Sequence, residues 1–233
     1  MNHLRRVDNS LSHVLRRVKA QMILAILLAS ILVSIVVHIL GMAAAGRLIG
    51  AKIETISLFF GPRLWHSKMG DTEFVLSLIP LGGFVKFDDG FQKFHPLKRV
   101  FVAASGCALL LVLAVVAFGF SGAFQKFFNG FMQILSGVLS PRSYGSQLFS
   151  TAYEFLKAAP FLACLGLIAS KMAAANMLPL PTMNGGEIIL TLLSWVKPMP
   201  ERVRERIQQF GFLILLIILI CWIVAFVYFL IGF

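Results

Sequence analysis

The stretch VVHILGMAAAGRLIGA, residues 36 to 51, places a histidine and a methionine one helical turn apart in an apolar segment. His38 and Met42 are four positions apart, so both side chains lie on one face of a helix. With glutamate instead of Ile39 and histidine instead of Met42, the stretch would read H-E-x-x-H, in which two histidines bind zinc and the glutamate is a general base. In the actual pattern only His38 is a strong zinc ligand, because a thioether is a weak partner for Zn²⁺. A His and Met pair suits Cu(I) better, but one of each makes a thin site.

A second unusual feature is a lysine inside another apolar segment. Lys171 interrupts the stretch from Ala158 to about Leu178. Charges within a membrane usually pair with one another or line a polar cavity, and Glu187 is the acidic residue that lies near the membrane interior. The sequence therefore predicts a buried pair of Lys171 and Glu187. The alternative is that Lys171 extends toward the interface while Glu187 faces cytoplasmic water.

The composition places these residues in a membrane protein. The 233 residues are 58% hydrophobic and only 13% charged, with a mean hydropathy of +0.87. Soluble domains contain about 25% charged residues, and one membrane crossing takes about 20 apolar residues. The sequence predicts an all-α polytopic membrane protein with about four transmembrane helices. The predicted spans are about 21–46, 100–124, 158–178 with a kinked continuation at 184–196, and 208–232.

The segment between the first two spans has a different pattern. Residues 52–87 are rich in β-branched and aromatic residues and are punctuated by Gly-Pro, KMGD and Gly-Gly. This pattern predicts a small membrane-associated β region with three short strands near 52–59, 62–66 and 72–78. Farther along, the phenylalanines between residues 120 and 131 have the spacing of an amphipathic helix.

Basic residues predict the orientation of the chain. They are concentrated between residues 47 and 99 and between 197 and 206, so these two segments are expected to share the cytoplasmic side. The formal charge of +11 thus reflects membrane asymmetry, and no nucleic-acid partner is expected. Residues 1–20 form a basic N-terminal arm on the opposite side, which suits an interfacial segment or a docking arm. Residues 21–233 form the membrane core.

Four stretches together resemble the site-2 protease family of intramembrane zinc metalloproteases. HILGMAAAGRLIGAKI resembles the family's H-E-L-G-H helix, and GPRLWHSKMGDTEFVLSLIPLGGFVKF is similar to its membrane-associated β region. NMLPLPTMNGGEII resembles the family's third span, which carries an L-D-G-G motif. KPMPERVRERIQQFGFLILL resembles the segment that leads into the family's last helix. The resemblance implies the family's membrane core, without the extramembrane PDZ domain that many bacterial members insert between spans two and three.

The same resemblance assigns roles to positions that carry the wrong residues here. The family's metal ligands correspond to His38, Met42 and Asn184, and its general base corresponds to Ile39. Because one of these four groups is retained, we expect no catalytic residue, no bound zinc and no other cofactor. The loss of the metal ligands is consistent with the loss of the base. Without the metal, two carboxylates would be uncompensated charges in the membrane, and Ile39 and Asn184 replace both of them.

A groove for a second membrane segment is the function that remains. In the family the β region is thought to offer a strand edge to an unwound substrate, so pairing without cleavage is a natural binding mode. A purely structural sheet is the alternative. The partner-binding candidates lie in residues 72–78 and in the PLGG turn: Thr72, Phe74, Leu76, Leu78, Pro80, Gly82 and Gly83.

These observations predict a catalytically inactive member of the family, a pseudoprotease in the bacterial inner membrane. It would act as a binding subunit, adaptor or regulator of another membrane protein, with membrane lipids as its surroundings. One alternative is an active zinc metalloprotease with an unconventional site. Another is a component of a transport complex, although no paired broken helices or repeats support it.

Overall fold

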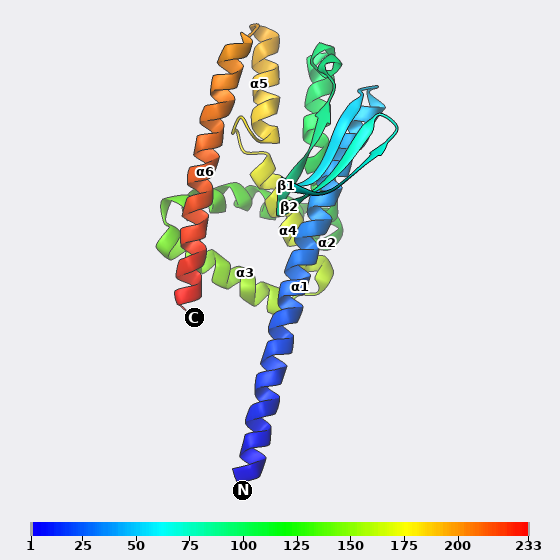
Figure 1. Cartoon of the computed structure of the whole chain (residues 1–233). Helices are drawn as coiled ribbons and strands as arrows, with labels where there is room; N and C mark the ends of the chain where they lie inside the picture. Colours follow the sequence, from blue (N-terminus) through cyan, green and yellow to red (C-terminus); the bar gives the residue numbers. More distant parts are fainter. Residues whose placement is uncertain (1, 233) are drawn as a thin grey trace.

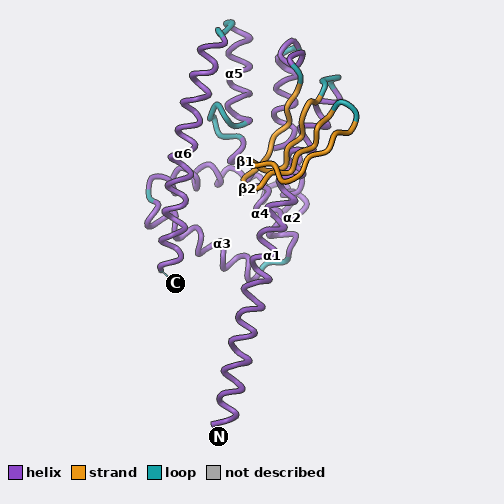
Figure 2. The backbone as a smooth tube through the Cα atoms, viewed as in Figure 1, coloured by secondary structure: helices purple, strands orange, loops and turns teal. Residues whose placement is uncertain are grey.

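The computed structural model describes the backbone of residues 2–232 and the side chains of residues 17–232 except Leu81. Long helices dominate it, and one small sheet follows the first helix (Figures 1 and 2). The elements in chain order are α1 (Asn2–Leu48), β1 (Ile53–Met69), β2 (Thr72–Phe87), η1 (Asp89–Lys93), α2 (Pro96–Leu139), η2 (Pro141–Gly145), α3 (Ser146–Ala158), α4 (Phe161–Asn176), α5 (Asn184–Val196) and α6 (Glu201–Ile231).

Among the described residues, three helices are long and apolar enough to cross a membrane. They are Arg17–Leu48 within α1, then α2 and α6. The predicted arm at 1–20 is not a separate element, because α1 runs without interruption from Asn2. Arg5, Arg6 and Arg16 of that arm lie outside the described side chains, so its docking role stays a prediction.

The predicted third span is broken in two. The helix α4 has 16 residues, or about 24 Å at 1.5 Å per residue, which is less than the hydrocarbon core of about 30 Å. It ends before Pro179 and Pro181, and α5 begins after them at Asn184. Proline cannot donate a helical hydrogen bond, and it disfavours helical conformation in the preceding residue. The irregular segment 177–183 therefore separates two short helices that together replace a continuous span.

The predicted small β region is confirmed, and it is formed by two long bent strands where three short strands were expected. The strands are antiparallel, and Thr55 pairs with both Lys86 and Glu73. The first half of β1 thus lies between two segments of β2. The bends occur at residues with positive φ, which are Phe59 at 71°, Gly61 at 85° and Gly82 at 139°. Gly61 and Gly82 adopt such angles without steric cost, so each strand can bend there and contribute twice to the sheet.

The helix α2 changes direction at Gly119, whose φ of 69° and ψ of 171° are not helical. Residues 120–139, which include the phenylalanines predicted to lie on an amphipathic helix, are helical and run across the molecule toward α6 (Figure 1). Trp222 of α6 contacts this part of α2 at Gly137, where a Cβ atom would lie 2.7 Å from the indole ring. Phe149 of α3 packs against the same face of α6, with its ring 5.5 Å from that of Trp222.

Small and apolar residues form the packed interior between the helices. Cys107 and Leu110 of α2 meet Ala169, Ala173 and Ala174 of α4 in one buried cluster. The sheet lies toward the end of the molecule that is opposite the N-terminus (Figure 1). Residues 197–200, which join α5 to α6, lie at the same end. The two basic segments of the sequence therefore share one end, as their charge predicts.

Candidate functional site

The fold brings the positions of the degenerate metal motif together from two distant parts of the chain. His38 and Met42 lie on α1, and Asn184 is the first residue of α5. Asn184 Nδ2 lies 3.2 Å from Met42 Sδ and also donates to the backbone oxygen of Ala103 on α2 at 2.6 Å. The amide therefore joins three helices, and its NH₂ group is already used by the protein.

His38 is enclosed by α2. Its side chain is buried, and Nδ1 makes no hydrogen bond within the described part of the chain. Gly106 permits this approach, because a Cβ atom there would lie 2.6 Å from Nδ1 and 2.6 Å from the His38 backbone oxygen. The imidazole is thus held in a close helix crossing and has one unpaired ring nitrogen.

Ile39, at the position of the family's general base, is a packing residue. It is 1% exposed and belongs to an apolar cluster with Ile35, Ala43, Ile53 and Ile56, which joins α1 to the sheet. Gly83 of β2 closes over it so tightly that a Cβ atom at residue 83 would collide with Ile39 Cδ1 and with the backbone oxygen of Ser57. Position 39 therefore lies beneath the sheet and contributes an apolar side chain to the packing between α1 and the sheet.

The residues at this site do not fit a zinc ion. Zinc sites in proteins use three or four strong ligands from His, Cys, Asp and Glu. Here the donors are one imidazole, one thioether and one amide whose nitrogen is engaged by Ala103. Among the described residues, no group of three His, Cys, Asp or Glu side chains could hold a metal ion anywhere in the chain.

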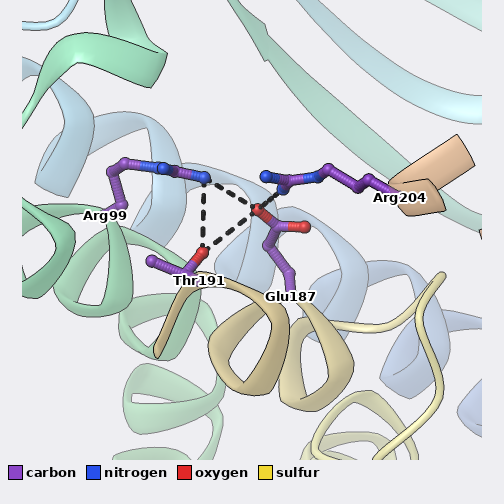
Figure 3. A network of polar contacts seen from close by, with 4 residues as sticks. All are labelled: Arg99, Glu187, Thr191 and Arg204. Atoms are coloured by element: carbon purple, nitrogen blue, oxygen red, sulfur yellow. Dashed lines mark hydrogen bonds and ion pairs between the residues drawn. The ribbon is translucent and has the colours of Figure 1, made fainter. Parts of the chain in front are cut away.

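The predicted pair of Lys171 and Glu187 is wrong. Lys171 Nζ donates to the backbone oxygen of Lys126 at 2.8 Å. Glu187 instead accepts from Arg99 Nη2 at 3.4 Å and from Arg204 Nη2 (Figure 3). The carboxylate in the first turn of α5 thus forms ion pairs with guanidinium groups of α2 and α6.

This second polar cluster consists of Arg99, Glu187, Thr191 and Arg204. Arg99 also donates to Thr191 Oγ1 at 3.3 Å, and the threonine hydroxyl in turn bonds Glu187 at 3.3 Å (Figure 3). The Arg99 side chain is only 9% exposed, so its charge depends on these partners. The cluster fastens the start of α5 to α2 and α6. Sequence reasoning did not find it, although Arg99 is the last charged residue before the second span.

The prediction that residues 72–78 form a free strand edge is also wrong for most of that segment. Phe74 pairs with Ile56 on one side and Ser67 on the other, and Leu76 pairs with Leu58 and Trp65. Thr72 is buried and donates to the backbone oxygen of Ile53 at 3.0 Å. The outer positions of the sheet belong instead to residues 63–69 and 83–87. Leu78, Pro80, Gly82 and Gly83 lie at the bend of β2 or just beyond it, and partner binding there stays a prediction.

Comparison with known proteins identifies the family. The model of peptidase family M50 matches residues 26–218, and the chain belongs to this family. The resemblance to the site-2 proteases is thereby confirmed, as is the helical membrane fold with its small sheet.

Similar proteins come from several bacteria and bear the name "Putative zinc metalloprotease". The one from Chlamydia trachomatis is 32% identical over 128 residues, which is 45% of this chain and 21% of the relative. The one from Neisseria meningitidis is 38% identical over 100 residues, which is 37% of this chain and 22% of the relative. A Helicobacter pylori J99 protein is 32% identical over 102 residues, 37% of this chain and 29% of the relative. The aligned part of this chain thus spans less than a third of each of these relatives.

Proposed function

We propose that this chain is a proteolytically inactive member of peptidase family M50 that holds another membrane protein without cutting it. One observation carries the proposal. The fold assembles His38, Met42 and Asn184 at one place, yet these residues offer zinc a single strong ligand. The position of the base, Ile39, is part of the apolar packing between α1 and the sheet.

The energetic consequence of the lost metal is large. Zinc lowers the pKa of bound water from 15.7 to about 7. Each pKa unit is worth about 1.36 kcal/mol, so forming hydroxide without the metal costs about 12 kcal/mol more. Hydrolysis by the mechanism of the family is therefore not sustained by this site.

The retained scaffold supports binding as the remaining role. Without a bound metal ion, two carboxylates at positions 39 and 184 would each cost about 2.5–3.5 kcal/mol in a membrane. Ile39 and Asn184 avoid this cost. The sheet still lies against α1 through the Ile39 cluster, and its outer segments 63–69 and 83–87 offer backbone groups for strand addition. A subunit, adaptor or regulator of a membrane protein fits this combination.

The expected setting is the inner membrane of a bacterium. The relatives from Chlamydia, Neisseria and Helicobacter are bacterial proteins. The two basic segments lie at one end of the molecule, where the positive-inside rule places the cytoplasm. In this orientation, the end of α1 that carries His38 and Met42 lies toward the cytoplasmic side.

Recovery of the bound protein tests the proposal. The tagged chain is purified from native membranes in mild detergent, and the masses of the proteins that remain bound are measured. The bound protein is then incubated with fresh chain and added zinc. We expect an intact membrane protein in stoichiometric amount that keeps its mass. Shortened fragments that appear only when the chain is present would contradict the proposal and favour an active protease with an unconventional site.

A further inference from the structure

We propose that Lys171 is the attachment point for a transmembrane segment of the partner that carries a carboxylate side chain. The inference rests on the proposed binding function and names the chemistry of the partner. Lys171 lies in the apolar helix α4, ten residues after its start at Phe161. It is partly buried, and its neighbours Cys164, Ala173 and Ala174 are packed in the interior.

The ammonium group of Lys171 has unused bonding capacity. Nζ donates one hydrogen bond, of 2.8 Å, to the backbone oxygen of Lys126. An ammonium group has three donors, so two remain for a ligand. The aliphatic part of the side chain runs past α2, where a Cβ atom on Gly130 would lie 3.6 Å from Lys171 Cδ. The charge is therefore held in a fixed position by the backbone of a neighbouring helix.

A second cationic side chain belongs to Lys126, the residue whose backbone oxygen accepts the hydrogen bond from Lys171. The kink at Gly119 lets the Lys126 ammonium group return over the ring of Phe118, 4.4 Å from the ring centre. In the described part of the chain, neither Lys126 nor Lys171 forms an ion pair with a carboxylate. Glu187, the acidic residue predicted to neutralise Lys171, is occupied by Arg99 and Arg204. The site thus has two positive charges and no internal counter-charge among these residues.

An intramembrane charge without a counter-charge is costly, and a carboxylate from outside the chain would remove that cost. A soluble anion would have to cross apolar surroundings to reach the site, because LGLIAS precedes Lys171 and MAAA follows it. A carboxylate on a transmembrane helix can reach this depth within the lipid. Charge complementarity therefore selects an acidic membrane segment as the occupant.

The face of α4 that carries Lys171 is partly exposed. Leu167, Ile168 and Ala175 of α4 are partly exposed and share the helical face of Lys171.

A model transmembrane peptide tests the proposal. Full-length chain with a C-terminal acceptor dye is reconstituted in phosphatidylcholine vesicles, and energy transfer is measured from a donor-labelled Leu-Ala peptide of about 20 residues. One peptide has a central glutamate and the matched peptide has glutamine. Because an intramembrane polar contact is worth about 1–2 kcal/mol, we expect the glutamate peptide to bind about tenfold tighter. Equal binding of the two peptides would overturn the proposal.

Variants of two lysines separate recognition from a structural role. Lys171→Gln keeps a donor for the Lys126 backbone oxygen but removes the charge, so it should abolish the preference for glutamate. Lys171→Arg should retain the preference. Lys157→Gln is the matched control, because Lys157 already pairs with Glu154 at 2.8 Å, and it should leave the preference unchanged. If Lys171→Gln lowers thermal stability yet retains the preference, Lys171 only fastens α4 to α2.

The outcome is distinguishable from a failure of the proposed function. If the peptides bind equally but the native partner is still recovered intact with the Lys171→Gln chain, the binding function stands and this inference fails. Cleavage of the native partner by the chain contradicts the proposed function whatever the peptides do.

Discussion

Ile39 offers the sharpest test of the view that the former base position is now a packing position. The side chain is 1% exposed and fills the space between α1, Ile56 and Gly83. Truncation of a fully buried isoleucine to alanine costs about 2–5 kcal/mol, because transfer energy is lost and a cavity remains. We therefore expect Ile39→Ala to lower the free energy of unfolding by about that amount, measured by denaturant titration in detergent.

The next residue along the helix supplies the control. Leu40 is 53% exposed on α1, so Leu40→Ala should change the free energy of unfolding by less than about 1 kcal/mol. Ile39→Glu adds the cost of an uncompensated charge, about 2.5–3.5 kcal/mol, to the lost packing. It should be the least stable of the three variants, with or without zinc. If Ile39→Ala and Leu40→Ala have equal stability, or zinc restores Ile39→Glu to the stability of the wild-type chain, the reasoning is refuted.

Two further substitutions test the kink and the polar cluster. Gly119→Ala should lower stability by about 1–3 kcal/mol, since φ of 69° with ψ of 171° is open to glycine and strained for other residues even where space is available. Thermal denaturation with no loss would show that α2 can straighten at Gly119. Glu187→Gln should cost about 1–3 kcal/mol because Arg99 is left buried with a weaker partner. Glu205→Gln, at an exposed site on α6, is its control, and equal melting temperatures for the two variants would contradict the role of the cluster.

The sequence predicted the long helices because hydrophobic length alone determines a membrane crossing. It also located the β region from β-branched and aromatic residues. It did not show the shape of the strands, since that depends on φ at Phe59, Gly61 and Gly82. The bends fold each strand back on the other, which is why the segment around Phe74 lies inside the sheet and not at its edge.

At the site, the resemblance to the family predicted that His38, Met42 and Asn184 lie close together, because the family's metal ligands occupy these positions. The partners of the charged groups could not be derived in the same way. Glu187 directly follows the kinked segment, so the sequence predicts it as the partner of Lys171. Arg99 and Arg204 compete for it from the ends of other helices, and sequence distance does not report that proximity. Lys171 instead donates to the backbone oxygen of Lys126, and no sequence pattern identifies a backbone acceptor of this kind.

Zinc content most directly tests the claim that the site has lost its metal chemistry. The wild-type chain and the double variant Met42→His with Asn184→Asp are purified in zinc-containing buffer, desalted and measured by inductively coupled plasma mass spectrometry. The variant regains three strong ligands with His38, so we expect about one zinc per chain for it and none for the wild type. About one tightly held zinc per wild-type chain, lost on His38→Ala, would contradict the account.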